Sequence, residues 1–216
     1  MDERISLIDI RLVGSRAEIH LSTHERPLVL SPETVHRYRL VKGTVLTRSQ
    51  AAQLETEAAR FAVASEATRL LARRPHSAGE LRQKLLRQFD AELVGAAIRD
   101  FTARGVLDDA QYAHQLADSL VRRKPCGRGY VIAFLESRRI ERALAAEAAD
   151  AVLSEHSPEE LAERALRAKW REFGQFDLET ARRRAYNYLA RRGFPFDIAR
   201  AAVQTLARES TDGGND

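Results

Sequence analysis

The stretch RRPHSAGELRQKLLRQF, from Arg73 to Phe89, shows how the chain is organised. Leu81, Leu85 and Phe89 recur every four residues, which is typical of the buried face of a helix. Ser77 and Glu80 form the S-x-x-E pattern that is typical of a capped helix start. The stretch also carries many cations: Arg73, Arg74, Arg82, Lys84 and Arg87. It therefore predicts a helix with one apolar side and a surplus of positive charge.

The composition predicts one or two folded domains. A slight excess of positive charge favours acidic partners without requiring one. The chain has 216 residues, of which 44% are hydrophobic and 31% are charged, so global disorder is excluded. The formal net charge is only +4. Since acids offset many of the cations, the electrostatic potential depends on how the charges are distributed along the chain.

Cysteine usage and the start of the chain favour the cytoplasm. Cys126 stands alone, so a disulfide scaffold within a monomer and a thiolate metal cluster are both excluded. The opening MDERISLIDIRLV has no basic flank, uninterrupted apolar run or cleavage site. No apolar stretch reaches the roughly 18 residues that a membrane span needs. We expect a cytoplasmic protein without a membrane segment.

Residues 1–46 predict a small antiparallel β-hairpin or meander that extends the N-terminus. RISLIDIRLV and RAEIHLST alternate apolar and polar residues, although the buried face of the first is ambiguous. RPLVL adds a short strand, and Ser31-Pro32-Glu33 predicts a brief capped helix. A segment this small is expected to pack on the rest of the chain.

From Thr47 onward the sequence predicts helices in a repeating pattern. Thr47 and Gln50 form a capping box, and strand signals do not return. An apolar triplet spaced five and then three residues occurs three times, at offsets of 51 and 54 residues: Leu93, Ile98 and Phe101; Leu144, Ala149 and Val152; Ile198, Val203 and Leu206. A preceding apolar pair also recurs: Leu81 and Leu85, Val131 and Leu135, Ala185 and Leu189. Chance spacing in Ala-rich helices is the alternative.

The predicted fold class is mainly α, with three tandem three-helix repeats in an elongated array and a small N-terminal antiparallel β segment. Residues 47–208 hold the repeats, at about 51–104, 105–154 and 155–208. Residues 209–216 are polar and predict a flexible tail.

Constellations that could carry catalysis or bind a metal have simpler structural interpretations. Asp108 and Asp109 are expected to open a helix. His20 and His24 lie on a predicted strand and its following turn, so they are not expected to share a metal. Cys126 has no dedicated His partner in the sequence, and the glycines of CGRGY are expected to break the chain between helices. We therefore expect neither an enzyme nor a cofactor.

The basic residues predict a partner-binding face if stacked repeats align them. The candidates lie at the ends of the first helices and along the middle helices of the repeats: Arg73, Arg74, Arg82, Lys84, Arg87, Arg122, Arg123, Lys124, Arg128, Arg138, Arg139, Arg182, Arg184, Arg191 and Arg192. A basic stripe would suit a nucleic-acid backbone or an acidic protein groove. Ordinary solvated helix faces are the alternative. Aromatic candidates for base stacking are few: Tyr130, Tyr186, Tyr188 and Phe194.

Two of these stretches resemble the RecX family, the modulators of the RecA recombinase. RRPHSAGELRQKLLRQF is similar to a family segment that reads basic, Ser, Glu-Leu and Lys-Leu, and RGVLDDAQYAHQLADSLVRR is similar to a Gly-x-Leu-Asp-Asp-x-x-aromatic-Ala stretch. The residues that match are Ser77, Glu80, Leu81, Lys84, Leu85, Gly105, Leu107, Asp108, Asp109, Tyr112 and Ala113. The resemblance spans about residues 51–208, and its three three-helix repeats agree with the spacing.

The chain departs from the family pattern after CGRGYVIAFLESRRI. The family usually shows an Arg-Ile pair early in this helix and a Lys-Gly or Arg-Gly before the closing Ile. Val131-Ile132 and Arg138-Arg139-Ile140 stand there instead. The turn after this helix, and any contact made there, is therefore not carried over. The N-terminal strands resemble an extension found in part of the family.

The resemblance implies a non-enzymatic regulator that binds within the groove of the RecA–DNA filament. It implies that the chain modulates, and mostly inhibits, RecA's ATPase, strand exchange and coprotease activities, with RecA and the DNA backbone as partners. Independently of the resemblance, one exposed array of this size is expected to work as a monomer. The alternative from the basic residues is a stand-alone nucleic-acid-binding protein. An enzyme with a dispersed site is the third hypothesis.

Overall fold

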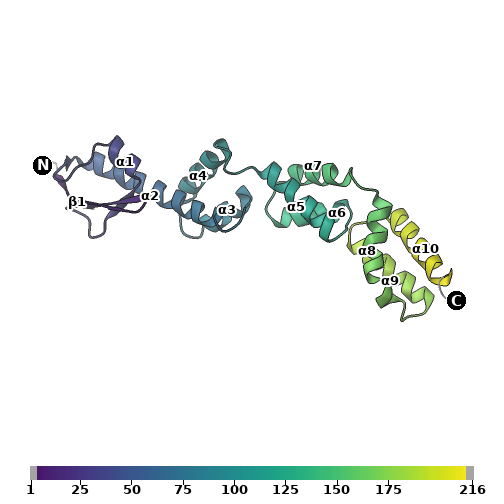
Figure 1. Cartoon of the computed structure of the whole chain (residues 1–216). Helices are drawn as coiled ribbons and strands as arrows, with labels where there is room; N and C mark the ends of the chain where they lie inside the picture. The colour runs from purple at the N-terminus through teal and green to yellow at the C-terminus, as the bar shows by residue number, and fades with distance from the viewer. Residues whose placement is uncertain (1–3, 213–216) are drawn as a thin grey trace. The chain divides into compact units, whose positions relative to one another are not determined.

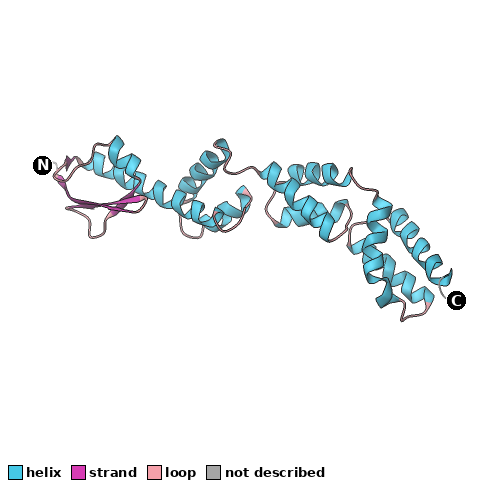
Figure 2. Cartoon of the chain, viewed as in Figure 1, coloured by secondary structure: helices cyan, strands magenta, loops and turns pink. Residues whose placement is uncertain are grey.

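The computed structural model describes residues 4–212, with a small sheet followed by helices (Figures 1 and 2). The described chain divides into two compact units. The first unit contains the residues up to Pro75 together with Leu81–Val106, and the second contains His76–Glu80 and the residues from Leu107 onward.

The sheet of the first unit has four antiparallel strands in the order β3-β2-β1-β4. The strands are β1 (Ile5–Val13), β2 (Arg16–Leu21), β3 (Leu28–Leu30) and β4 (Val45–Leu46). The register of β1 on β2 shifts between Leu7 and Asp9, which is a β-bulge. Leu7 is buried, Ile8 is 53% exposed, and Ile10 contacts the core again. The bulge therefore explains why no single period of two fits RISLIDIRLV.

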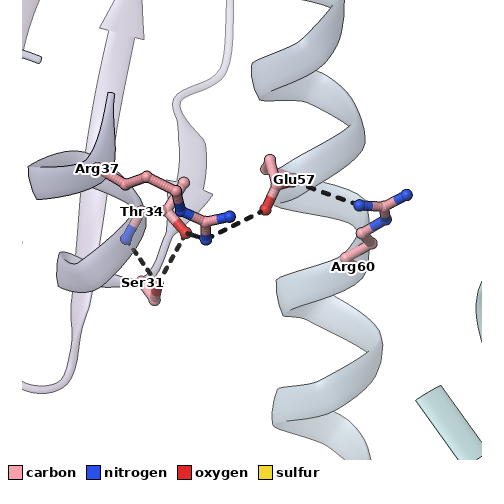
Figure 3. Close-up of polar contacts among 5 residues, drawn as sticks. All are labelled: Ser31, Thr34, Arg37, Glu57 and Arg60. Atoms are coloured by element: carbon pink, nitrogen blue, oxygen red, sulfur yellow. Dashed lines mark hydrogen bonds and ion pairs between the residues drawn. The ribbon is translucent and has the colours of Figure 1, made fainter. Parts of the chain in front are cut away.

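Two helices cover this sheet and contact each other through Glu57 (Figure 3). Helix α1 (Pro32–Arg37) begins where the Ser31 hydroxyl accepts the N–H of Thr34 at 3.0 Å, as predicted. Arg37 pairs with Glu57 of α2 (Arg48–Leu71) at 3.8 Å, and Glu57 also pairs with Arg60 at 3.4 Å. The two arginines are exposed, so these ion pairs contribute little stability, and the apolar contacts of α2 with the sheet hold it in place.

Helix α2 packs against the sheet with one part and against α4 with another. The predicted capping box is present at its start, where Thr47 and Gln50 bond reciprocally. Ala51 and Leu54 pack into the core of the sheet, whereas Val63 and Ala67 are buried further along the helix. The later part of α2 packs on α4 (Ala91–Ala103).

Helix α3 (Ala78–Leu85) is shorter than the apolar spacing predicted. Leu81 and Leu85 are buried as expected, but Phe89 lies beyond the helix end. The N–H groups of Arg87 and Gln88 bond to carbonyls three residues back, which tightens the last turn and ends the helix. The chain then reverses, and Asp90 caps α4 through the N–H of Glu92.

The second unit contains the remaining six described helices. They are α5 (Asp109–Arg123), α6 (Arg128–Ser137), α7 (Arg142–Leu153), α8 (Pro158–Phe173), α9 (Leu178–Arg191) and α10 (Phe196–Asp212). One apolar core joins them, and the middle-helix pairs lie at its centre: Val131, Leu135, Ala185 and Leu189 are all buried. The recurring apolar pair therefore marks core positions, as predicted from the sequence. In the triplets, four members are only partly buried: Leu93, Ile98, Leu144 and Ile198.

The predicted fold class is confirmed as mainly helical, built from three-helix sets after a small antiparallel sheet. The glycines of CGRGY were predicted to break the chain between helices. This is right for Gly127, which precedes α6, but wrong for Gly129, which lies inside it. The repeat boundaries and the elongated arrangement stay proposals. Helix α10 includes residues 209–212, and residues 213–216 of the predicted tail lie outside the described residues.

Candidate partner-binding surface

The predicted basic residues divide into three groups by the contacts of their side chains. In the first group, a carboxylate neutralises the cation. Arg128 holds Asp150 through two bonds of 2.6 and 2.8 Å, which lowers the pKa of Asp150. Arg122 bonds to Asp118 at 2.7 Å in the same way along α5. The neighbouring carboxylate cancels much of the positive potential of such a cation, so it attracts an acidic partner less strongly.

In the second group, the cation takes part in packing and backbone contacts. Arg192 donates to the carbonyl of Pro125 at 3.1 Å and lies over the ring of Tyr188. Lys124 donates to the hydroxyl of Tyr130 at 2.7 Å. Arg74 and Arg123 donate to nearby carbonyls, and Arg184 lies over the ring of Phe176. Arg138 lies over the ring of Phe134 and also pairs with Glu80 at 3.9 Å, so it shares the feature of the first group. These side chains are partly committed to the fold.

In the third group, the cation has no ion pair among residues 4–212. Arg82, Lys84 and Arg87 belong to the first unit, on α3 and the turn after it. The others are Arg73, Arg139, Arg182 and Arg191. All except Lys84 are exposed, and Lys84 is partly exposed. This group, which we call the unpaired cations, is the part of the predicted set that is best placed to meet an acidic partner.

Some basic residues also shape a recurring backbone junction in the second unit. The Ser77 hydroxyl donates to the carbonyl of Arg138 at 2.6 Å and accepts the N–H of Glu80 at 3.0 Å. Fifty residues later, the N–H of Gly127 donates to the carbonyl of Arg192 at 2.8 Å. The first bond joins the start of α3 to the end of α6, and the second joins the start of α6 to the end of α9. These three are the middle helices of their three-helix sets. Arg138 and Arg192 therefore contribute backbone as well as charge.

The two aspartates at Asp108 and Asp109 cap helices, but they do so in different places. Asp108 accepts the N–H of Gln111 at 2.9 Å and so caps α5, as predicted. Asp109 instead accepts the N–H of Ala78 at 2.8 Å, at the start of α3. Partial burial is the main cause that raises the pKa of Asp109. No local sequence pattern signals this second contact, since 31 residues separate the partners.

The groups considered for catalysis or metal binding have different surroundings. His24 bonds to Glu55 at 3.0 Å, while His20 lies on β2. Within residues 4–212, no group of three or more His, Cys, Asp or Glu side chains could hold a metal ion. Cys126 is buried, and burial raises the pKa of its thiol to about 11, so little thiolate exists at neutral pH.

A partly enclosed cavity beside this thiol is mostly apolar. It measures about 280 Å³ and its apolar wall includes Leu153, Leu161 and Phe194. The Arg128–Asp150 pair supplies its charged side chains. A neutralised pair beside apolar residues can fill space and orient a side chain, but it offers no activated nucleophile.

The aromatic residues considered for base stacking fall into core and surface. Phe194 is only 6% exposed and belongs to the core. Tyr130 and Tyr188 contact Lys124 and Phe173, respectively. Tyr186 instead stacks on Phe196, which is 73% exposed. Phe196 was not among the candidates from the sequence, because the spacing in GFPFD does not tell which phenylalanine turns inward.

Within residues 4–212, no helix combines the length and the apolar character that a membrane span requires.

Comparisons with known proteins point to one family. Sequence profiles of the first and the third three-helix domains of RecX match residues 65–100 and 158–203. The regulatory protein RecX of Halorhodospira halophila is 37% identical over 164 residues, which is 74% of this chain and 97% of that protein. The RecX of Amycolatopsis mediterranei is 32% identical over 141 residues, covering 65% of this chain and 80% of that protein.

Solved structures of RecX proteins share the fold. A crystal structure of regulatory protein RecX aligns with a TM-score of 0.75 at 19% identity, over 92% of this chain and 98% of that chain. The RecX of Lactobacillus salivarius aligns with a TM-score of 0.59 at 14% identity, over 68% of this chain and 96% of that chain. At such identities the likeness concerns the fold alone.

Proposed function

Because this chain belongs to the RecX family of regulatory proteins, we propose that it regulates the RecA recombinase by binding in the groove of the RecA–DNA filament. In this proposal it inhibits RecA's ATPase, strand exchange and coprotease activities without catalysing a reaction itself. It acts as a cytoplasmic monomer whose partners are RecA and the DNA backbone.

The observation that carries this proposal is the set of unpaired cations. Arg82, Lys84 and Arg87 lie within six residues of one another, and none of them has an ion pair among the residues that the structure describes. Three like charges this close repel one another, and a fold gains nothing from that repulsion. An acidic partner such as a phosphate backbone or a carboxylate-lined groove would relieve it.

The experiment that tests regulation is a titration of RecA's single-stranded-DNA-dependent ATP hydrolysis. RecA and this chain are taken from the same organism, and the salt concentration is fixed. We expect hydrolysis to fall at ratios below one chain per RecA, since one bound chain in a filament affects many subunits. Unchanged hydrolysis and strand exchange at equimolar ratio would rule the proposal out.

A second candidate function is a stand-alone nucleic-acid-binding protein, and the same unpaired cations favour it. Phosphate contacts release counterions, so the affinity for DNA without RecA should fall steeply as salt rises. Binding that is absent, or that does not change with salt, would exclude this candidate. Light scattering on the free chain tests the monomer in both cases.

A further inference from the structure

We infer that Tyr186 and Phe196 form a platform on which an unpaired base of a single-stranded nucleic acid stacks. The two rings lie 5.9 Å apart between centroids, with an interplanar angle of 20°, so they are stacked. The inference deepens the nucleic-acid contact of the proposed function and rests on it. It adds a named site and a preference for single strands.

The exposure of Phe196 is the first step of the argument. Phe196 is the first residue of α10 and is 73% exposed, although phenylalanine is usually buried in folded proteins. Tyr186 is partly buried and packs against the core of the second unit, so it fixes one side of the Phe196 ring. A flat ring that is held from one side and open on the other is the geometry that base stacking requires.

The charges around the rings are the second step. Arg182 and Arg183 precede Tyr186 by four and three residues on α9, so helical periodicity places them on its side of the helix. Arg200 follows Phe196 by four residues on α10, in the same relation. All three arginines are exposed and have no ion pair among residues 4–212. Within four residues of either ring the chain carries one acid, Asp197, so cations outnumber acids there.

The exposed ring pair and the neighbouring arginines together favour a single strand over a duplex. Every base offers a π face once it is unstacked, while bases within a duplex are already covered by their neighbours. The arginines supply phosphate contacts that do not depend on the base. An acidic protein surface would also satisfy the arginines, but it would have no general use for a flat exposed ring pair. We therefore assign the site to single-stranded nucleic acid.

The test compares Phe196→Ala with the unaltered full-length chain by fluorescence anisotropy. Three labelled probes of equal length are used: an oligothymidine, an abasic oligonucleotide with the same backbone, and a duplex. Loss of one stacked base should weaken binding to the oligothymidine by about 5- to 100-fold. Binding to the abasic strand and to the duplex should stay within about twofold. Phe196→Trp should bind the oligothymidine like the unaltered chain.

Leu178→Ala is the matched control, because Leu178 is another exposed large apolar residue of the second unit, at 47% exposure. It should leave all three affinities unchanged. Equal losses of Phe196→Ala on the oligothymidine and the abasic strand would overturn the platform but keep the nucleic-acid contact. Unchanged DNA binding with loss of RecA inhibition would overturn it in favour of a protein contact. Failure of the unaltered chain to bind any probe would overturn both.

Discussion

The backbone of Gly127 lies directly against the backbone of Gly193, at the junction between α6 and the end of α9. A Cβ added at Gly127 would overlap with the carbonyl oxygen of Gly193, and the N–H of Gly127 donates to the adjacent carbonyl of Arg192 at 2.8 Å. Gly193 itself has a φ of 76°, in the left-handed region. The close approach allows two middle helices to meet without a side chain between them.

Replacing Gly127 by Ala should therefore destabilise the second unit. The added methyl group meets backbone atoms that cannot rotate away, so we expect a loss of about 2 kcal/mol or more in the free energy of unfolding. Urea denaturation followed by circular dichroism measures this change. Gly129→Ala is the control, since nothing lies within 4 Å of its added Cβ inside α6. It should stabilise by roughly 0.5–1 kcal/mol, and equal effects of the two changes would contradict the junction.

The position that corresponds to Gly193 in the preceding middle-helix turn is Arg139, which has a φ of 59°. Left-handed backbone is unfavourable for a residue with a Cβ by about 1–2 kcal/mol. We expect Arg139→Gly to stabilise the chain by up to about 1 kcal/mol, since the greater freedom of glycine in the unfolded chain offsets part of the gain. Arg139→Ala removes the same charge but keeps the Cβ, so it should give no such gain in the same urea titration.

Ser77→Ala should be more damaging than the loss of an ordinary cap. The Ser77 hydroxyl is buried, caps α3 through Glu80, and donates to the carbonyl of Arg138. We expect a loss of about 2–3 kcal/mol, because both the cap and the partner of a partly buried carbonyl disappear. Ser157→Ala is the comparison, since Ser157 also caps a helix through Glu160 but is only partly buried. It should lose about 1 kcal/mol, and a loss as large as that of Ser77→Ala would argue against the buried bond.

Asp109 should make the chain less stable as pH rises from the acid range. Burial raises its pKa above 3.8, so its contribution to stability is full below pH 3.8 and is lost as pH rises through the folded-state pKa. Asp109→Asn keeps an acceptor for the N–H of Ala78 but cannot ionise. We expect its stability relative to the unaltered chain to increase over that pH range and then level off.

Asp177 provides the contrast of opposite sign. The N–H of Thr180 donates to its carboxylate at 2.9 Å, and this bond lowers the pKa of Asp177. Its contribution is present above pH 3.8 and is lost as pH falls through the lowered pKa. Asp177→Asn should therefore lose stability relative to the unaltered chain as pH rises toward 3.8. Urea titrations at several pH values measure both changes, and parallel trends would show that the Asp109 assignment is wrong.

The unpaired cations on and after α3 should set much of the salt dependence of DNA binding. Replacing Arg82, Lys84 and Arg87 together by Gln should weaken binding. It should also reduce the slope of log affinity against log salt by ~0.7 for each phosphate of a single strand that is no longer neutralised. The control replaces Arg11, Arg69 and Arg104 by Gln, which removes the same charge from the first unit, although these arginines already pair with Asp9, Glu66 and Asp100. Equal slopes for the two triple variants would refute a specific basic site.

The positions of helices followed from short-range chemistry that a sequence displays directly. The Thr47 capping box, the Ser31 cap and the apolar pair Val131 and Leu135 all depend on residues a few positions apart. Helical periodicity then brings such residues to one face whatever the rest of the chain does. The three-helix repeats and the small N-terminal sheet were predictable for this reason.

Burial and pairing across the chain were decided only by the tertiary structure. Arg128 bonds to Asp150, 22 residues away in the sequence, and Ser77 bonds to Arg138, 61 residues away. No local sequence pattern could predict either contact. Phe194 and Phe196 are chemically identical and two residues apart, yet one is in the core and the other is exposed. Local sequence sets which residues can share a helix face, but packing between helices decides which side chains meet a partner and which face the solvent.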